Sequence, residues 1–265
     1  MDISQTYRWS GGLLGDHEPD AVQVEGNPQS RFVITCDHGG NRVPERLSNL
    51  GLPQTELSRH IGWDIGALGV ARHLVRLLDG ILIHQPYSRL VIDCNRPPHV
   101  PEAFPQRSDG TNISGNMDMS AADAAARVAE IFLPYHRAIA SALDARPRQG
   151  VVLLAMHTYT PEHGDYPDAR PWPISFLFNR DARLSRRLER TLRASGINVG
   201  MNQPYLVDDV GDYAIPVHAE TRNILSTLIE VRQDLVEHDE GQRDWAQTIA
   251  QGVRDAIKHE ELQDE

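Results

Sequence analysis

The chain has 265 residues, enough to bury a full core, and its 40 % hydrophobic and 24 % charged residues are those of an ordinary globular protein. Its formal net charge of −11 at pH 7 argues against non-specific binding to nucleic acid or to an anionic membrane, although a few arginines could still form a pocket for an anionic substrate. The sequence has no apolar run of the roughly 18–20 residues that cross a bilayer and begins without a signal-peptide pattern, so we expect a cytoplasmic protein.

Short β-branched runs alternate with longer helical patterns along the first half of the chain. Strands are expected over residues 31–36, 81–84 and 90–94. Between the first two, apolar residues recur every three or four positions from Ile65 to Leu78, and Gly80 follows, which predicts a helix. The stretch 96–116 is rich in Pro, Gly, Asn and Ser and is expected to be a long loop, a feature that is often functional.

The second half continues the same alternation. Ser120 to Asp123 resembles a capping box and precedes an apolar stripe over 128–143, inside which Pro134 predicts a kink or a split helix. Strands are expected over 151–156, 174–178 and 226–232, and helices over 184–192 and 245–257. This pattern predicts an α/β fold, a three-layer sandwich around a central mixed, mostly parallel sheet, with residues 1–265 forming a single domain.

Polar or ionisable side chains stand at the ends of four of the expected strands. Because ligands of open α/β sheets collect at the carboxyl ends of the strands, these side chains would form one pocket if the four ends converged. The residues are Asp37, His38, Asp93, Asn95, Arg96, His157, Glu230 and Arg232.

His38 and His157 differ from the rest of the 12 histidines because each directly follows an apolar strand. A neutral imidazole in that position suits a first-row divalent metal such as zinc, but a structural loop histidine is the ordinary alternative. The two cysteines, Cys36 and Cys94, cannot form a disulfide framework and are expected to be buried, reduced thiols, which again favours the cytoplasm.

Four ordered motifs carry a resemblance to a known family. HGGN (38–41), YSRLVIDCNRPP (87–98), MHTYTP (156–161) and LIEVR (228–232) resemble the N-formylglutamate amidohydrolases. They are more distantly similar to the zinc-dependent carboxypeptidases and to the aspartoacylase and succinylglutamate desuccinylase group. The resemblance spans residues 31 to 232 approximately, and YSRLVIDCNR is its most specific part. It implies a zinc-exopeptidase-like fold.

The resemblance also implies an activity and the residues that perform it. His38 and His157 would bind a divalent metal, zinc or else cobalt, manganese or iron, and Glu230 would be the general base. Asn95 and Arg96 would bind a substrate carboxylate. The implied reaction is metal-dependent hydrolysis of the linear amide bond of an N-formyl, or other N-acyl, acidic amino acid such as N-formylglutamate. The expected binding partner is thus a small anionic substrate, and binding to nucleic acid or to a membrane is not expected. The protein is expected to be a monomer or small homo-oligomer.

One position departs from the pattern of the distant relatives. The relatives have a His-x-x-Glu motif, but in this sequence Asn41 stands at the position of the glutamate. A neutral amide is a poor zinc ligand. Asp64, in GWDIGA, resembles an acid found at the same place in formylglutamate hydrolases and is favoured as the third ligand, although Asp at a helix start is also an ordinary cap. Asp37 and Glu45 are alternatives, and Asp37 could instead orient His38.

Two further arginines are candidates for substrate binding. Arg89 precedes an apolar run and either binds a substrate carboxylate together with Arg96 or forms an internal salt bridge, for example with Asp93. Arg232 lies two residues after Glu230 on the same strand face and either joins the other arginines or forms a salt bridge at the rim of the sheet.

The two glycines after His38 have an expected role of their own. Gly39 and Gly40 would let the backbone turn sharply, so that His38 faces the pocket and substrate approaches closely.

Two other functions stay open. The same apparatus could act as a deacylase or peptidase on another N-acyl amino acid or short peptide, with the acyl pocket reshaped by residues 97–116 and 162–173. A non-catalytic binder of acidic metabolites is the second alternative, which Asn41 brings into consideration. A serine hydrolase is disfavoured because the sequence has no Gly-x-Ser-x-Gly motif.

Overall fold

The computed structural model describes residues 12–147, 150–164 and 169–261. It contains a seven-stranded sheet with the strand order β1-β3-β2-β6-β9-β7-β8. The pairs β3–β2, β2–β6, β6–β9 and β7–β8 are parallel, whereas β1–β3 and β7–β9 are antiparallel, so the sheet is mixed and mostly parallel, as predicted. Its strands are β1 (Gln23–Gly26), β2 (Phe32–Cys36), β3 (Ile81–His84), β6 (Val152–Tyr159), β7 (Ile174–Leu177), β8 (Val199–Met201) and β9 (Leu225–Arg232).

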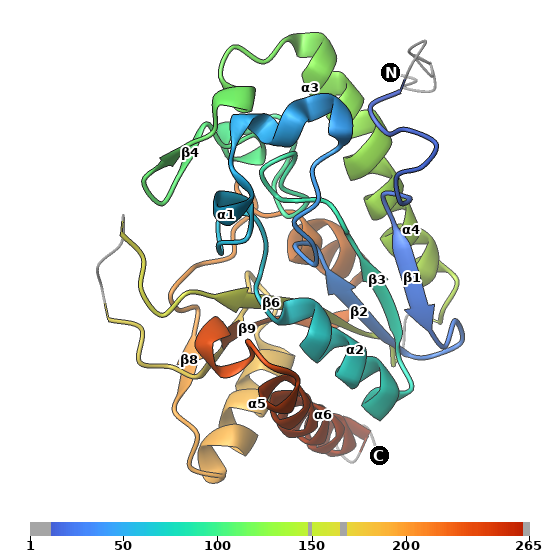
Figure 1. Cartoon of the computed structure of the whole chain (residues 1–265). Coiled ribbons are helices and arrows are strands. Elements are labelled where there is room, and N and C mark those ends of the chain that lie inside the picture. The colour runs from blue at the N-terminus through green and yellow to red at the C-terminus, as the bar shows by residue number, and fades with distance from the viewer. Residues whose placement is uncertain (1–11, 148–149, 165–168, 262–265) are drawn as a thin grey trace.

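Helices cover both faces of this sheet (Figure 1). On one face α2 (Ala67–Leu78), α5 (Arg183–Ala194) and α6 (Asp239–Glu261) pack together over a core that includes Leu154 and Ile229. On the other face α3 (Ala121–Arg127), a π-helical segment (Val128–Phe132) and α4 (Leu133–Asp144) cover a core that includes Leu153 and Leu228. Neighbouring residues of one strand thus enter opposite cores, and the predicted three-layer sandwich is confirmed.

The segment expected to be a strand over 90–94 is not one, and that prediction is wrong. Residues 89–96 form successive turns, with the N–H of Val91 bonded to Ser88 O and the N–H of Arg96 bonded to Asp93 O. Its apolar side chains are buried nevertheless, because the turns lie inside the core of the α4 face rather than in the sheet. An apolar run this short has the same composition in a buried turn as in a strand.

The long helical stripe changes its hydrogen-bond pattern next to Pro134. The proline is the second residue of α4, directly after the π-helical segment, and the backbone stays helical through Phe132 and Leu133, so the predicted split takes the form of a π-helical turn rather than a break. Ser120 caps α3 by accepting the N–H of Asp123 at 3.1 Å. The short elements that the sequence did not indicate are β1, β8, the helix α1 (Gln54–Leu57) and the hairpin of β4 (Arg107–Ser108) and β5 (Thr111–Asn112).

None of the helices in the described ranges is both long and apolar enough to cross a membrane.

Candidate functional site

The central parallel strands carry ionisable side chains to one end of the sheet. His38 follows β2, His157 lies in β6 and Glu230 lies in β9. His157 and Glu230 are register partners across the β6–β9 pair. Together with Asp64, which comes from the loop before α2, they line a cavity of about 650 Å³. All four side chains are buried, so the cavity reaches the interior of the molecule.

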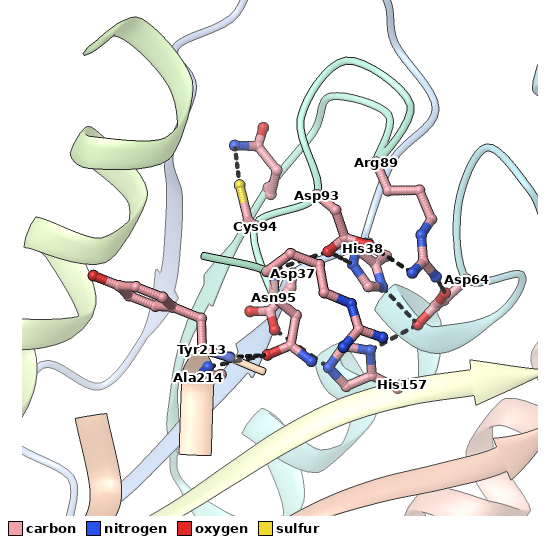
Figure 2. A network of polar contacts seen from close by, with 12 residues as sticks. Asp37, His38, Asp64, Arg89, Asp93, Cys94, Asn95, His157, Tyr213 and Ala214 are labelled. Atoms are coloured by element: carbon pink, nitrogen blue, oxygen red, sulfur yellow. Dashed lines mark hydrogen bonds and ion pairs between the residues drawn. The ribbon is translucent and has the colours of Figure 1, made fainter. Parts of the chain in front are cut away.

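His38, Asp64 and His157 form a compact cluster at this cavity. Each offers one ligand atom, and these atoms lie within 4.8 Å of one another. Figure 2 shows Asp64 between the two imidazoles, with its Oδ2 3.3 Å from His38 Nδ1 and 2.9 Å from His157 Nδ1. Two imidazole nitrogens and one carboxylate oxygen are the donor set of a catalytic zinc site, which keeps a further position open.

Asp64 does not cap helix α2, the alternative that its sequence position suggested. The helix begins after Gly66, whose φ is 82°, and no side chain caps its first turn. The Asp64 carboxylate instead accepts the N–H of Thr158 at 3.3 Å and faces the two imidazoles. Its own N–H donates to His38 O at 3.0 Å, so the backbone also ties the two segments together.

A second carboxylate lies behind each imidazole. His38 Nε2 lies 2.7 Å from Asp93 Oδ1, and His157 Nε2 lies 3.3 Å from Asp37 Oδ2. Asp37 also accepts a hydrogen bond of 2.5 Å from the hydroxyl of Tyr135. Carboxylates in this position fix the ring orientation and the basicity of metal-binding histidines. Asp37 thus lies behind His157 rather than His38, at an ion-pair distance without a hydrogen bond between these two atoms, and Asp93 lies behind His38.

The acids around the cluster also set its protonation. Burial opposes a charged imidazole, but the contacts of His157 with Asp37 and Asp64 outweigh burial and raise its pKa well above the usual value. A raised pKa favours the protonated form of this imidazole when no metal is bound. Because metal ligands must be deprotonated, a divalent cation would take the place of that positive charge.

Glu230 stands apart from this network. Burial raises the pKa of its carboxyl to about 7. Its Oε2 is buried and has no hydrogen-bond partner among the described residues. A carboxylate that titrates near neutral pH beside a cluster of metal-ligand type is suited to moving a proton during catalysis.

The glycines of the HGGN turn allow the chain to pack against itself. A Cβ at Gly40 would lie 2.1 Å from the carbonyl oxygen of Pro86, and one at Gly39 would lie 3.2 Å from that of Gln85. Neither position has a positive φ. The backbone of residues 85–86, rather than a substrate, thus lies against the two glycines. This packing positions the turn that carries His38.

A protein-family model matches most of the chain. The model described as N-formylglutamate amidohydrolase matches residues 30–237. The chain belongs to the N-formylglutamate amidohydrolase family.

Two solved structures are also similar to the chain. A gene product of Agrobacterium tumefaciens is 31 % identical in sequence with a TM-score of 0.88, over 94 % of this chain and 99 % of that one. An N-formylglutamate amidohydrolase from Ralstonia eutropha JMP134 is 21 % identical with a TM-score of 0.62, over 91 % of this chain and 98 % of that one, a likeness that shows the fold. No curated protein matches the sequence.

In this member of the N-formylglutamate amidohydrolase family, three arginines line the cavity: Arg89, Arg96 and Arg170. Arg89 Nη2 lies 2.6 Å from Asp93 Oδ2, and its Nη1 lies 3.5 Å from Asp64 Oδ1. The turns over 89–96 make this internal salt bridge geometrically accessible, which a strand would not. Arg96 Nη1 donates to Gly211 O at 2.6 Å. The side chains of Arg89 and Arg96 are 29 % and 31 % exposed, so both can still meet a ligand.

Asn95 and Arg232 make other contacts. The buried amide of Asn95 donates to Asp212 Oδ1 and accepts the N–H of Ala214, which leaves one amide N–H for another acceptor. Arg232 pairs with Asp234 at 2.8 Å and is not among the residues that line the cavity, so the salt bridge at the sheet rim is what the structure shows.

The remaining alternatives for the third ligand lie elsewhere. Asn41 donates to Leu57 O, and Glu45 is an exposed side chain 3.1 Å from His17.

Sequence reasoning missed Asp212, which lines the cavity, and Tyr135, which bonds Asp37 behind it. It placed Asp93 in the pocket but not its contact with His38, because all of these contacts depend on segments far apart in the chain and have no local signal. The two segments expected to reshape the acyl pocket do contribute to its walls, apart from residues 165–168, which lie outside the described residues. They supply Glu102, Pro105, Ser108, His163, Ala169, Arg170 and Trp172.

Proposed function

We propose that the chain is a metal-dependent hydrolase that cleaves the amide bond of an N-formyl acidic amino acid, such as N-formylglutamate. The observation that carries the proposal is the buried Glu230 carboxylate, in register with His157 of the His38–Asp64–His157 cluster. Its Oε2 has no hydrogen-bond partner among the residues that the structure describes, and three guanidinium groups line the same cavity. A general base, a metal-ligand set and binding groups for carboxylates are what this reaction requires.

The metal would be held by His38, Asp64 and His157, with zinc favoured and cobalt, manganese or iron as alternatives. The donor set fits, because Nδ1 of both imidazoles faces the same Asp64 oxygen while their Nε2 atoms face the supporting acids Asp93 and Asp37. A bound divalent metal supplies a Lewis acid that polarises the substrate carbonyl and acidifies a water molecule.

The protein's own side chains would perform the remaining steps. Glu230 takes a proton from the attacking water and delivers it to the leaving nitrogen as the C–N bond breaks. The products are formate and the free amino acid. Arg96 and Arg89 bind the two carboxylates of the substrate through charge-assisted hydrogen bonds, and Asn95 adds its remaining amide N–H.

A substrate panel tests this assignment. The metal-loaded protein would be assayed with the N-formyl, N-acetyl and N-succinyl derivatives of glutamate and of a neutral amino acid of similar size. We expect the highest kcat/KM for N-formylglutamate and a marked loss when the side-chain carboxylate is absent. No hydrolysis of any derivative, with less than about a tenth of an equivalent of bound metal, would favour the non-catalytic binder instead.

The size of the cavity favours a second candidate, a deacylase for a larger N-acyl group or a short peptide. A volume of about 650 Å³ lies in the range that holds drug-sized ligands and exceeds the need of a formyl group. Apolar and aromatic residues such as Trp172, Tyr205 and Leu206 line part of it. A higher kcat/KM for an N-acetyl, N-succinyl or dipeptide substrate in the same panel would select this candidate.

The proposed setting is a cytoplasmic, single-domain protein that is a monomer or small homo-oligomer. Cys36 and Cys94 are buried free thiols, which suits a reducing compartment.

A further inference from the structure

A second group of two histidines and one aspartate lies outside the cluster described above. His60 follows the short helix α1, Asp109 lies in the turn between β4 and β5, and His163 lies in the segment after β6. The ligand atoms of these three residues lie within 4.8 Å of one another. His60 and His163 line the same cavity as His38 and His157. Three segments far apart in the sequence thus bring a metal-type donor set to its wall.

The geometry of this group suits a shared cation. Asp109 lies between the imidazoles, with its Oδ2 3.3 Å from His60 Nε2 and its Oδ1 3.4 Å from His163 Nδ1. The two rings are nearly edge to face, with centroids 5.6 Å apart. The side chains of His60, Asp109 and His163 are 19 %, 11 % and 13 % exposed, so the group is largely shielded and still reachable from the cavity.

His60 provides an independent indication of a ligand. Its Nε2 is buried and forms no hydrogen bond within the described residues, although Asp109 is close. With the ring proton on Nδ1, this buried nitrogen would offer its lone pair to a cation beside Asp109.

Asp109 is held in place by groups behind it. The Gly164 N–H donates to its Oδ1 at 2.7 Å, and Arg59 Nη2 donates to its Oδ2 at 2.8 Å. Arg59 in turn pairs with Glu56 at 2.6 Å, so the charges of Glu56, Arg59 and Asp109 sum to −1. The first cluster has a related feature, an arginine (Arg89) near the second oxygen of its aspartate. An aspartate that is held in position within a group of net negative charge favours the binding of a divalent cation at that aspartate.

We propose that His60, Asp109 and His163 form a second divalent metal site of the zinc class. The donor set of two imidazoles and one carboxylate selects zinc or cobalt over magnesium or calcium, which prefer oxygen ligands. The cation ties the segment after β6 to the β4–β5 hairpin and to the end of α1, and so fixes one wall of the substrate cavity. Water or a substrate group from the cavity completes its coordination.

Metal stoichiometry tests the proposal without any assay of activity. The protein and its variants are stripped with a chelator and titrated with Co²⁺, and bound metal is measured by elemental analysis together with the visible absorption of Co²⁺. The wild type should bind about two equivalents. His60→Gln and His163→Gln should each bind about one, with at least about tenfold weaker binding at the lost site. His99→Gln, which changes an exposed histidine, is the matched control and should bind about two.

Asp64→Asn separates this proposal from the proposed function. It should lose the other equivalent, and the double variant with His60→Gln should bind none. One equivalent in the wild type that Asp64→Asn abolishes and His60→Gln leaves intact would overturn the second site and leave the proposed function standing. One equivalent that only the His60 and His163 variants abolish would support the second site and count against the first. A wild type that binds no Co²⁺ would overturn both.

Discussion

His157 and Glu230 face each other across the parallel pair β6–β9. His157 belongs to a cluster that could hold a metal ion, and Glu230 has a buried Oε2 without a hydrogen-bond partner among the described residues. Residues paired in register on neighbouring parallel strands point to the same face, so both side chains enter the cavity. We propose that His157 is a metal ligand and Glu230 the general base, and each role can be tested separately.

The first prediction concerns Glu230. Glu230→Gln removes the proton acceptor but keeps the size of the side chain, so we expect turnover to fall at least about 100-fold while metal content is unchanged. Turnover on N-formylglutamate and bound metal would be measured on the same preparation. Turnover near that of the wild type would assign the base to another residue.

The second prediction concerns Asp64. Asp64→Asn removes a negatively charged donor that lies between two imidazoles, so the affinity for Zn²⁺ or Co²⁺ at this cluster should fall at least about 100-fold. Competition with a chelator of known affinity measures the change. Gln54→Glu, a charge change on the short helix α1 away from the cluster, serves as the control; equal affinities in all three proteins would exclude Asp64 as a ligand.

The third prediction concerns the carboxylate behind His157. Asp37→Asn weakens the support of the His157 ring, and we expect a 10–100-fold loss of metal affinity, roughly the usual effect of such partners. Tyr135→Phe removes only the hydroxyl that donates to Asp37 and should have a smaller effect in the same direction. An Asp37→Asn protein with unchanged metal affinity and activity would contradict the orienting role.

The fourth prediction concerns substrate carboxylates. Arg96→Gln removes a half-exposed guanidinium from the cavity wall, and the loss of a charge-assisted hydrogen bond of about 1.5–3 kcal/mol should raise KM for N-formylglutamate by about 10–150-fold. Arg76→Gln, on the exposed side of α2, is the control and should leave KM unchanged. A neutral N-formyl amino acid should show a smaller increase with Arg96→Gln; equal increases for both substrates would indicate a structural role.

The fifth prediction concerns stability at acid pH and a buried pair of histidines. His136 Nε2 lies 2.8 Å from Cys94 O and must donate its proton there, so its Nδ1 accepts the proton of His218 Nε2, also 2.8 Å away. The buried Nδ1 of His218 is then left unprotonated without a partner in the described residues. Burial lowers the pKa of His136 to about 4, and burial together with the charges of His136 and Arg222 lowers that of His218 to about 3.

The direction of this pH dependence follows from the shifts. Both folded-state pKa values lie below the unfolded value of about 6.5, so the unfolded chain binds more protons. The contribution of these two histidines to the free energy of unfolding should be fully present above about pH 6.5 and should fall by up to about 1.4 kcal/mol per pH unit for each histidine as the pH drops towards 4. Urea denaturation at several pH values measures it. His218→Gln should reduce the slope and His99→Gln should not; an unchanged slope in both would refute the assignment.

The local pattern of the chain was sufficient to predict most of the sheet and part of the site. His38, His157 and Glu230 follow or lie in strands whose continuous apolar runs can be recognised over a few residues, and parallel strands bring such positions to one edge of the sheet. The helices of both outer layers were predicted for the same reason, because their apolar stripes repeat over two turns or more.

Tertiary packing decided the rest. The apolar run over 90–94 is buried by turns instead of a strand, and only this path places Asp93 against both His38 and Arg89. Asp64 could have been a helix cap until its carboxylate was seen to face two imidazoles. His60 carried no signal at all, because its partners Asp109 and His163 come from loops about 50 and 100 residues away. Strand ends are fixed by hydrogen bonds of the sheet, whereas loop contacts depend on where distant segments pack, which no short stretch of sequence encodes.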